Sequence, residues 1–146
     1  MFGKKGVSPL IATVLLIAFS VALGAVVMTY SGSLGECGSV YIELVEKGGE
    51  PEVCLDGYDL IFTLENGPKE AISSFKLTYY GNLDATTIDL EETLGPGEVR
   101  KFTTEYNSNA FGALEKFKIV PVVIENGGQL ICPSEKSIIV QGIPRC

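Results

Sequence analysis

The chain has 146 residues, of which 18 are Asp or Glu, 11 are Lys or Arg and none is His, giving a formal net charge of −7 at pH 7. An acidic surface repels phosphate backbones, so the composition argues against a nucleic-acid-binding protein. Without histidine no Ser-His or Cys-His nucleophile can form. We therefore expect that the protein is not an enzyme, that it has no catalytic residues and that it binds no cofactor.

The first element is an uncharged apolar run from Val7 to Met28, preceded by Lys4 and Lys5. A helix of this length rises about 33 Å, enough to cross a hydrocarbon core of ~30 Å. A core helix is rarely apolar on all faces over such a length. We therefore predict a membrane-spanning helix over residues 7–30. Basic residues before it would keep the N-terminus inside and place the following domain outside.

Three kinds of N-terminal segment are compatible with this run. A cleaved secretory signal normally has a shorter apolar region, although the small residues near Ser33 would allow cleavage there. A permanent signal anchor is the second alternative. The third follows from the sequence "GKKG" and the "VSPLIATVLLIAFSVALGAVVMTYSGS" after it. This stretch resembles the class III signal peptide and N-terminal helix of archaeal type IV pilins.

The resemblance implies a short cleaved leader and a retained helix. Residues 1–6 would be the leader, and a prepilin peptidase would cut between Gly6 and Val7 on the cytoplasmic side. The helix would first span the membrane and later pack inside a filament. Bacterial type IV pilins carry a glutamate at the fifth mature position, which is Ile11 here. Archaeal relatives commonly lack that glutamate, so this departure favours the archaeal branch.

Small residues are spaced along the run in a way that suits close helix packing. Ser20 and Gly24 are four apart and share one face of a helix, and a second stripe begins at Ala18. The candidate helix-packing residues are Ala12, Ala18, Ser20, Ala22, Gly24 and Ala25.

Residues 31–36, rich in Ser and Gly, predict a flexible linker, and residues 37–146 a single head domain. Apolar residues in the head alternate with period two, and Gly, Pro and Asn turns separate the segments. The expected strands are 40–46, 58–65, 74–80, 86–92, 99–106, 116–125 and the segment "KSIIVQG". A single helical turn is expected within 107–116.

About seven short strands with frequent turns are typical of a β-sandwich. The segments "LENGP", "ISSFKLTYYG" and "LGPGEVRKFTTEY" resemble the immunoglobulin-like heads of archaeal pilins. The predicted fold class is therefore α+β, with a long N-terminal apolar helix followed by an all-β immunoglobulin-like sandwich.

The head contains four cysteines, Cys37, Cys54, Cys132 and Cys146. Four cysteines outside the cell would be disulfide-bonded, and three pairings are possible. The sequence spacing favours local bridges, Cys37–Cys54 and Cys132–Cys146. With no Cys-x-x-Cys motif and no histidine we expect no zinc site. The segment "DGYD" offers oxygen ligands but not the full pattern of a calcium loop, so we expect no metal there.

These expectations describe a structural subunit that polymerises with copies of itself into an extracellular filament, for adhesion or surface attachment. The implied partners are the prepilin peptidase, the assembly platform with its ATPase, and the cytoplasmic membrane, where the precursor is inserted with its head outside. The alternative is a membrane-anchored binding module, or a minor pilin that does not form the bulk of a filament.

Overall fold

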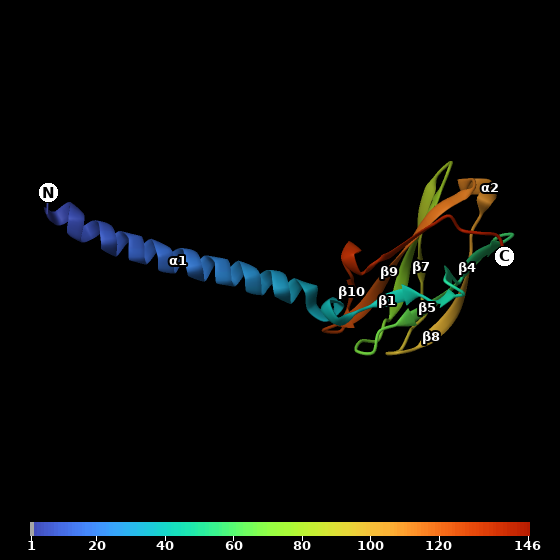
Figure 1. Ribbon diagram of the computed structural model, residues 1–146, viewed down its shortest axis with the longest axis horizontal. Helices are drawn as coiled ribbons and strands as arrows, with labels where there is room; N and C mark the ends of the chain where they lie inside the picture. Colours follow the sequence, from blue (N-terminus) through green and yellow to red (C-terminus); the bar gives the residue numbers. More distant parts are fainter. Residues whose placement is uncertain (1) are drawn as a thin grey trace. The chain divides into compact units, whose positions relative to one another are not determined.

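The computed structural model describes the backbone of residues 2–146 and the side chains of residues 8–27 and 37–146. The chain divides into two units, Met1–Gly35 and Glu36–Cys146. The first is a single helix, α1 (Phe2–Leu34), and the second is a β-rich head (Figure 1). The predicted α+β class is therefore confirmed. The helix continues through most of the predicted linker and is followed by a 3-10 turn, η1 (Gly35–Ser39).

One sheet of the head is built on β5 (Asp59–Asn66). On one side β5 pairs along its length with β8 (Val99–Glu105). On its other side lie two short strands end to end, β1 (Ile42–Leu44) and β4 (Val53–Asp56), both antiparallel to β5. The chain between them forms a small hairpin of β2 (Glu46–Lys47) and β3 (Glu50–Pro51). This sheet therefore has three rows of strands.

The second sheet is built on the longest strand, β9 (Leu114–Glu125). On one side it pairs with β6 (Ser74–Gly81), which in turn pairs with β7 (Ala85–Leu90). The other side of β9 again carries two short strands end to end. These are β10 (Gly128–Ile131) and β11 (Ile138–Gln141), separated by the 3-10 turn η2 (Ser134–Lys136).

The eleven strands thus occupy seven rows and one small hairpin. The row order is β1/β4–β5–β8 in one sheet and β10/β11–β9–β6–β7 in the other. This is the arrangement of an immunoglobulin-like sandwich, in which strands A, B and E face G, F, C and C′. A single turn, α2 (Ser108–Phe111), connects β8 to β9 where one helical turn was predicted.

Aromatic rings from both sheets meet in the core. Between ring centroids, Phe62 of β5 lies 5.6 Å from Phe102 of the neighbouring strand β8. It lies 5.5 Å from Phe117 of β9 in the opposite sheet. The Tyr79 hydroxyl of β6 donates a buried hydrogen bond of 2.6 Å to Thr104 Oγ1 of β8, which joins the two sheets. Burial raises the pKa of Tyr79, because the charged phenolate would lose its hydration.

The predicted inward faces are largely confirmed. In β5 and β6 the alternating residues Leu60, Phe62, Leu64, Phe75, Leu77 and Tyr79 are all buried. Tyr58 was expected on the same face, but it lies in the turn before β5 and is 49% exposed. The strands β4 and β10 were not predicted, because each is four residues long and lies beside turn residues.

The predicted local disulfide pairing is wrong. The bridges are Cys37–Cys132 and Cys54–Cys146, with Cα–Cα distances of 5.5 Å and 4.9 Å. The reason is that β1 and β4 are not two arms of one hairpin. Ile42 pairs with Asn66 and Cys54 with Ile61, so the two ends of this row are about 17 Å apart at ~3.4 Å per residue. A disulfide needs Cα atoms within about 7 Å.

Candidate functional site

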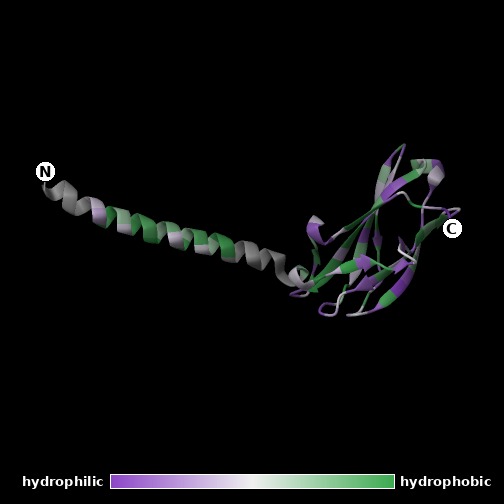
Figure 2. Cartoon of the chain, in the orientation of Figure 1, coloured by the Kyte–Doolittle hydropathy of each residue, from purple (hydrophilic) through white to green (hydrophobic). Residues whose placement is uncertain are grey.

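The candidate functional site is the apolar helix α1. Its stretch Ser8–Val27 is long and apolar enough to cross a membrane, and none of it is buried (Figure 2). The large apolar side chains within it are 50–66% exposed. Burial of one such side chain stabilises by roughly 1.5–3 kcal/mol. Exposure of the whole segment to water would therefore be strongly unfavourable in free energy. The helix therefore requires lipid or other protein around it.

Two hydroxyl side chains within the segment are satisfied by the helix itself. Thr13 Oγ1 donates to the carbonyl oxygen of Pro9 at 2.7 Å, and Ser20 Oγ donates to that of Leu16 at 2.8 Å. Both bonds follow the spacing at which a hydroxyl reaches back to its own helix. These hydroxyls need no partner from a neighbour, so they cost little in an apolar medium.

Pro9 lies inside the helix and has no N–H to donate to the carbonyl of Lys5. The backbone turn that lacks this hydrogen bond contains the Gly6–Val7 peptide bond, where leader cleavage is predicted. If Val7 were the first residue, Pro9 would be third, where a missing N–H costs nothing. Gly6 has no side chain and that of Val7 lies outside the described residues, so the roles of both residues stay predictions.

The small residues fall on two faces of the helix. Ala18, Ala22 and Ala25 lie within about 60° of one another at 100° per residue, and Ser20 and Gly24 form a separate face. Ala12 lies between these two faces. A Cβ added at Gly24 would meet no atom within 4 Å. The helix therefore offers two narrow strips at which another helix could approach closely, and their use in packing stays a prediction.

No protein-family model, curated protein or solved structure matches this chain.

The two disulfides clamp the head at both ends of one edge of the sandwich. Cys37 of η1, just before β1, is joined to Cys132, which follows β10, and Cys54 of β4 is joined to Cys146 in the segment after β11. The described cysteines are all paired. Cys37 follows directly after the helix. The C-terminal segment runs beside β4, where Cys146 N donates to Leu55 O. Such bridges are typical of proteins in an oxidising compartment, such as the cell exterior.

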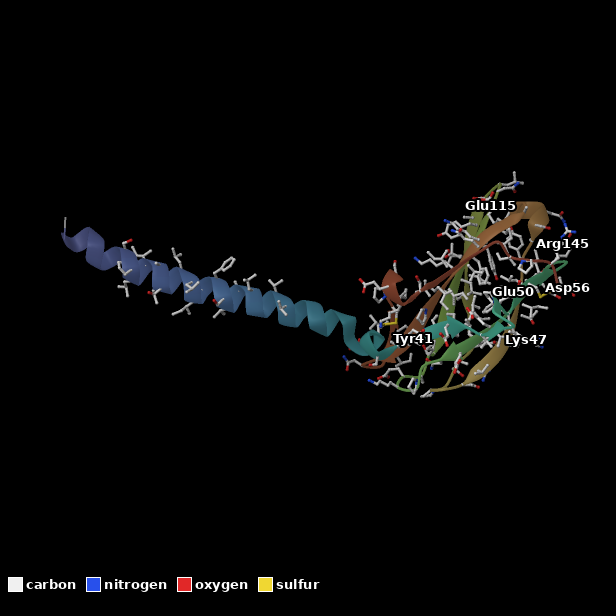
Figure 3. The ribbon with its side chains drawn as sticks, in the orientation of Figure 1. Tyr41, Lys47, Glu50, Asp56, Glu115 and Arg145 are labelled. Atoms are coloured by element: carbon white, nitrogen blue, oxygen red, sulfur yellow. A yellow bond between two sulfur atoms is a disulfide. The ribbon has the colours of Figure 1, made fainter. Side chains whose placement is uncertain are left out.

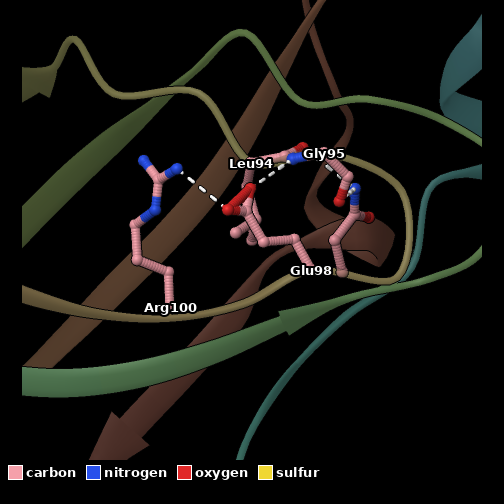
Figure 4. A network of polar contacts seen from close by, with 5 residues as sticks. Leu94, Gly95, Glu98 and Arg100 are labelled. Carbon is pink, nitrogen blue, oxygen red and sulfur yellow. Dashed lines mark hydrogen bonds and ion pairs between the residues drawn. The ribbon is translucent and has the colours of Figure 1, made fainter.

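A polar network holds the loops at one end of the sandwich (Figure 4). Glu98 accepts from Gly95 N at 2.8 Å and from Arg100 at 2.9 Å. These bonds hold the pKa of Glu98 below its usual range, the one from Gly95 most of all. Asn66, only 2% exposed, donates through Nδ2 to the carbonyl oxygens of Glu70, Leu94 and Gly95.

One hollow of the head, about 540 Å³, is lined mainly by apolar or small residues such as Leu55, Ala113 and Ile143. Within residues 8–27 and 37–146 no three His, Cys, Asp or Glu side chains are grouped so that they could hold a metal ion.

Proposed function

We propose that this protein is the structural subunit of an extracellular filament of the type IV pilus kind. The observation that carries the proposal is the apolar stretch Ser8–Val27, none of which is buried, joined to a head that two disulfides clamp. The helix spans the membrane while the subunit waits with its head outside. It then leaves the lipid and packs against the helices of other subunits, so that its apolar surface remains out of water.

The leader sequence supports the same proposal. Lys4 and Lys5 hold the N-terminus on the cytoplasmic side, and a prepilin peptidase removes residues 1–6 there. Loss of these residues changes the formal net charge of the chain from −7 to −9, because both lysines leave. An assembly platform and its ATPase supply the work of moving the helix out of the membrane. The role of the filament is adhesion or surface attachment.

The alternative is a permanently anchored binding module with the same head, or a minor pilin. If it is an anchored module, the helix never leaves the lipid, and the protein stays in the membrane fraction after shearing. A charge in the middle of the helix separates these possibilities, since Ala18 lies on one of the two small-residue faces. Ala18→Asp would place a carboxylate without a partner in the dry interior of a filament.

The experiment compares sheared extracellular material with membranes from cells that express the native chain, Ala18→Asp or Ala18→Ser. The proposal predicts that the native chain and Ala18→Ser enter filaments and that Ala18→Asp does not. Protease accessibility of the head on intact cells verifies that each variant is inserted with its head outside. Filaments of ordinary yield from inserted Ala18→Asp subunits would contradict a helical filament core and favour the anchored module.

A further inference from the structure

Three carboxylates lie side by side on the outer face of the β5 sheet. Asp56 of β4 is directly opposite Asp59 of β5, and Asp59 is directly opposite Glu105 of β8. All three side chains are exposed, and they alternate with inward neighbours such as Leu60 and Leu55. We call these three residues the acidic row. Asp56 marks its position at one end of the head in Figure 3.

The acidic row costs stability in an isolated head. Directly opposite residues of an antiparallel pair have Cβ atoms ~4.5–5.5 Å apart, and like charges at this distance repel. Among the described residues none of the three carboxylates forms an ion pair, and Arg145 on the neighbouring C-terminal segment forms none either. A row of like charges without an ion pair in the described head is suited to a cationic partner.

The outer face of the other sheet carries the complementary charge. Lys116 and Lys118 are two residues apart on β9, with the buried Phe117 between them pointing inward. Lys116 Nζ lies 4.7 Å from the centroid of the Tyr80 ring, and Lys118 Nζ donates to Ser134 Oγ at 3.4 Å. Neither amine has a carboxylate partner among the described residues. We call Lys116 and Lys118 the lysine pair.

Apolar surface lies beside the lysine pair. Ile139 of β11 is directly opposite Lys118 and is 57% exposed. On the acidic side, Ile61 and Thr103 form the next outward row beyond Asp59 and Glu105. A contact between the two faces would therefore pair charges and cover apolar surface at once, as protein interfaces do.

The two faces cannot meet within one head. They point outward from opposite sheets of the same sandwich, with the aromatic core between them. We infer that the acidic row of one copy docks on the lysine pair of a second copy. Because the two surfaces differ, the contact is heterologous, and repetition of it gives an open chain of heads. This contact rests on the proposed function, because the packed helices of a filament hold the copies side by side.

A carbodiimide tests this contact directly, since it condenses a carboxylate and a lysine amine into an amide only where the two touch. Full-length native chain, half of it isotope-labelled, is reconstituted at high density in phosphatidylcholine vesicles and cross-linked. Peptide mass spectrometry then identifies the joined residues. We expect mixed-isotope links from Lys116 or Lys118 to Asp56, Asp59 or Glu105. Links should disappear in 1 M salt, where charges are screened beyond about 3 Å.

Charge reversal gives the second arm. Lys116→Glu with Lys118→Glu should abolish the mixed-isotope links and the filaments, and so should Asp59→Lys with Glu105→Lys. In a mixture of the two variants the intact acidic row of the first can meet the intact lysine pair of the second, so links between these two should return. All four changes in one chain should likewise restore filaments. Lys47→Glu with Lys69→Glu makes the same change of net charge as the lysine-pair variant, on other exposed segments, and is its matched control.

The outcomes separate this inference from the proposed function. The docking inference would be overturned if both charge-reversed variants formed filaments at the native yield, or if the native chain formed filaments without any mixed-isotope link. Either result would leave the proposed filament subunit unaffected. Mixed-isotope links in vesicles from a chain that never forms filaments would support docking and count against the filament. Links from the lysine pair to carboxylates outside the acidic row would also overturn the inference.

Discussion

Cys37 and Cys132 are 95 positions apart in the chain, yet their Cα atoms lie 5.5 Å apart. Cys37 is the second residue of the head, so this bridge ties the point at which the helix joins the head to the β10/β11 row. The start of the head is therefore linked covalently to the residue that follows β10, which pairs with β9, the longest strand.

Loss of either bridge should weaken the head by about 2–5 kcal/mol, because each closes a loop of more than ninety residues. The paired changes are Cys37→Ser with Cys132→Ser, and Cys54→Ser with Cys146→Ser. Denaturant unfolding of the detergent-solubilised chain measures the loss. Non-reducing peptide maps of the native chain should contain the bridges of the structure, and a Cys37–Cys54 peptide would refute this arrangement.

The fold was predictable from the sequence where alternation is regular, and the disulfides were not. Long strands such as β5 and β6 alternate clearly between buried and exposed residues, so period two identifies them. The pairing of cysteines depends on which strand rows become neighbours at the open edge of the sandwich, and spacing along the chain does not contain that information. The acidic row was hidden for the same reason, because Glu105 meets Asp59 only through the register of β5 and β8.

Asn66→Asp should destabilise the head more than Asn66→Ala. In the native chain Nδ2 donates to three carbonyl oxygens at 2.6–3.1 Å. Alanine removes all three bonds but leaves only the Glu70 carbonyl oxygen without another protein donor, because those of Leu94 and Gly95 still accept from Ile72 N and Glu98 N. An acceptor left unpaired where water does not reach costs about 1–3 kcal/mol. Aspartate also places a carboxylate oxygen next to the three carbonyl oxygens, so electrostatic repulsion adds to the loss of stability. Denaturant midpoints rank the variants, and an aspartate variant as stable as the native chain would contradict the assigned network.

Acid should weaken the head partly through Glu98. Its pKa in the folded head lies below its ordinary value of 4.5, so its contribution to stability is complete above that value. The contribution is lost as the pH falls through the lowered pKa of the folded state. Glu98→Gln should therefore flatten the fall in stability below about pH 4.5. An unchanged pH dependence of the unfolding free energy would show that these hydrogen bonds do not act on Glu98.

Bulk on a small-residue face of the helix should impair assembly without preventing membrane insertion. Gly24→Leu fills the strip that Gly24 and Ser20 share, so a neighbouring helix would be forced outward. Val21→Leu adds volume at a residue that is already large and serves as the control. The measure is the ratio of filament to membrane-bound subunit. Equal ratios for Gly24→Leu and Val21→Leu would argue that this strip is not a helix contact.

Gly6→Val should leave the leader attached. A β-branched side chain at the last leader residue would crowd the small-residue site that the resemblance assigns to the prepilin peptidase. The uncut chain keeps Lys4 and Lys5 beside the helix, and these charges would have to enter the filament core. Immunoblots should therefore detect a longer chain in membranes and none in the sheared fraction. A shortened Gly6→Val chain would contradict the proposed cleavage position.

The intact mass and N-terminal sequence of the extracellular protein test the central claim most directly, because they report whether the helix is retained after the leader is removed. The account predicts a chain that begins at Val7, contains the whole apolar segment and carries two disulfides. A chain that begins beyond Ser33 would contradict it, since the helix would then be a discarded export signal. An extracellular chain that still begins at Met1 would also contradict the proposed cleavage.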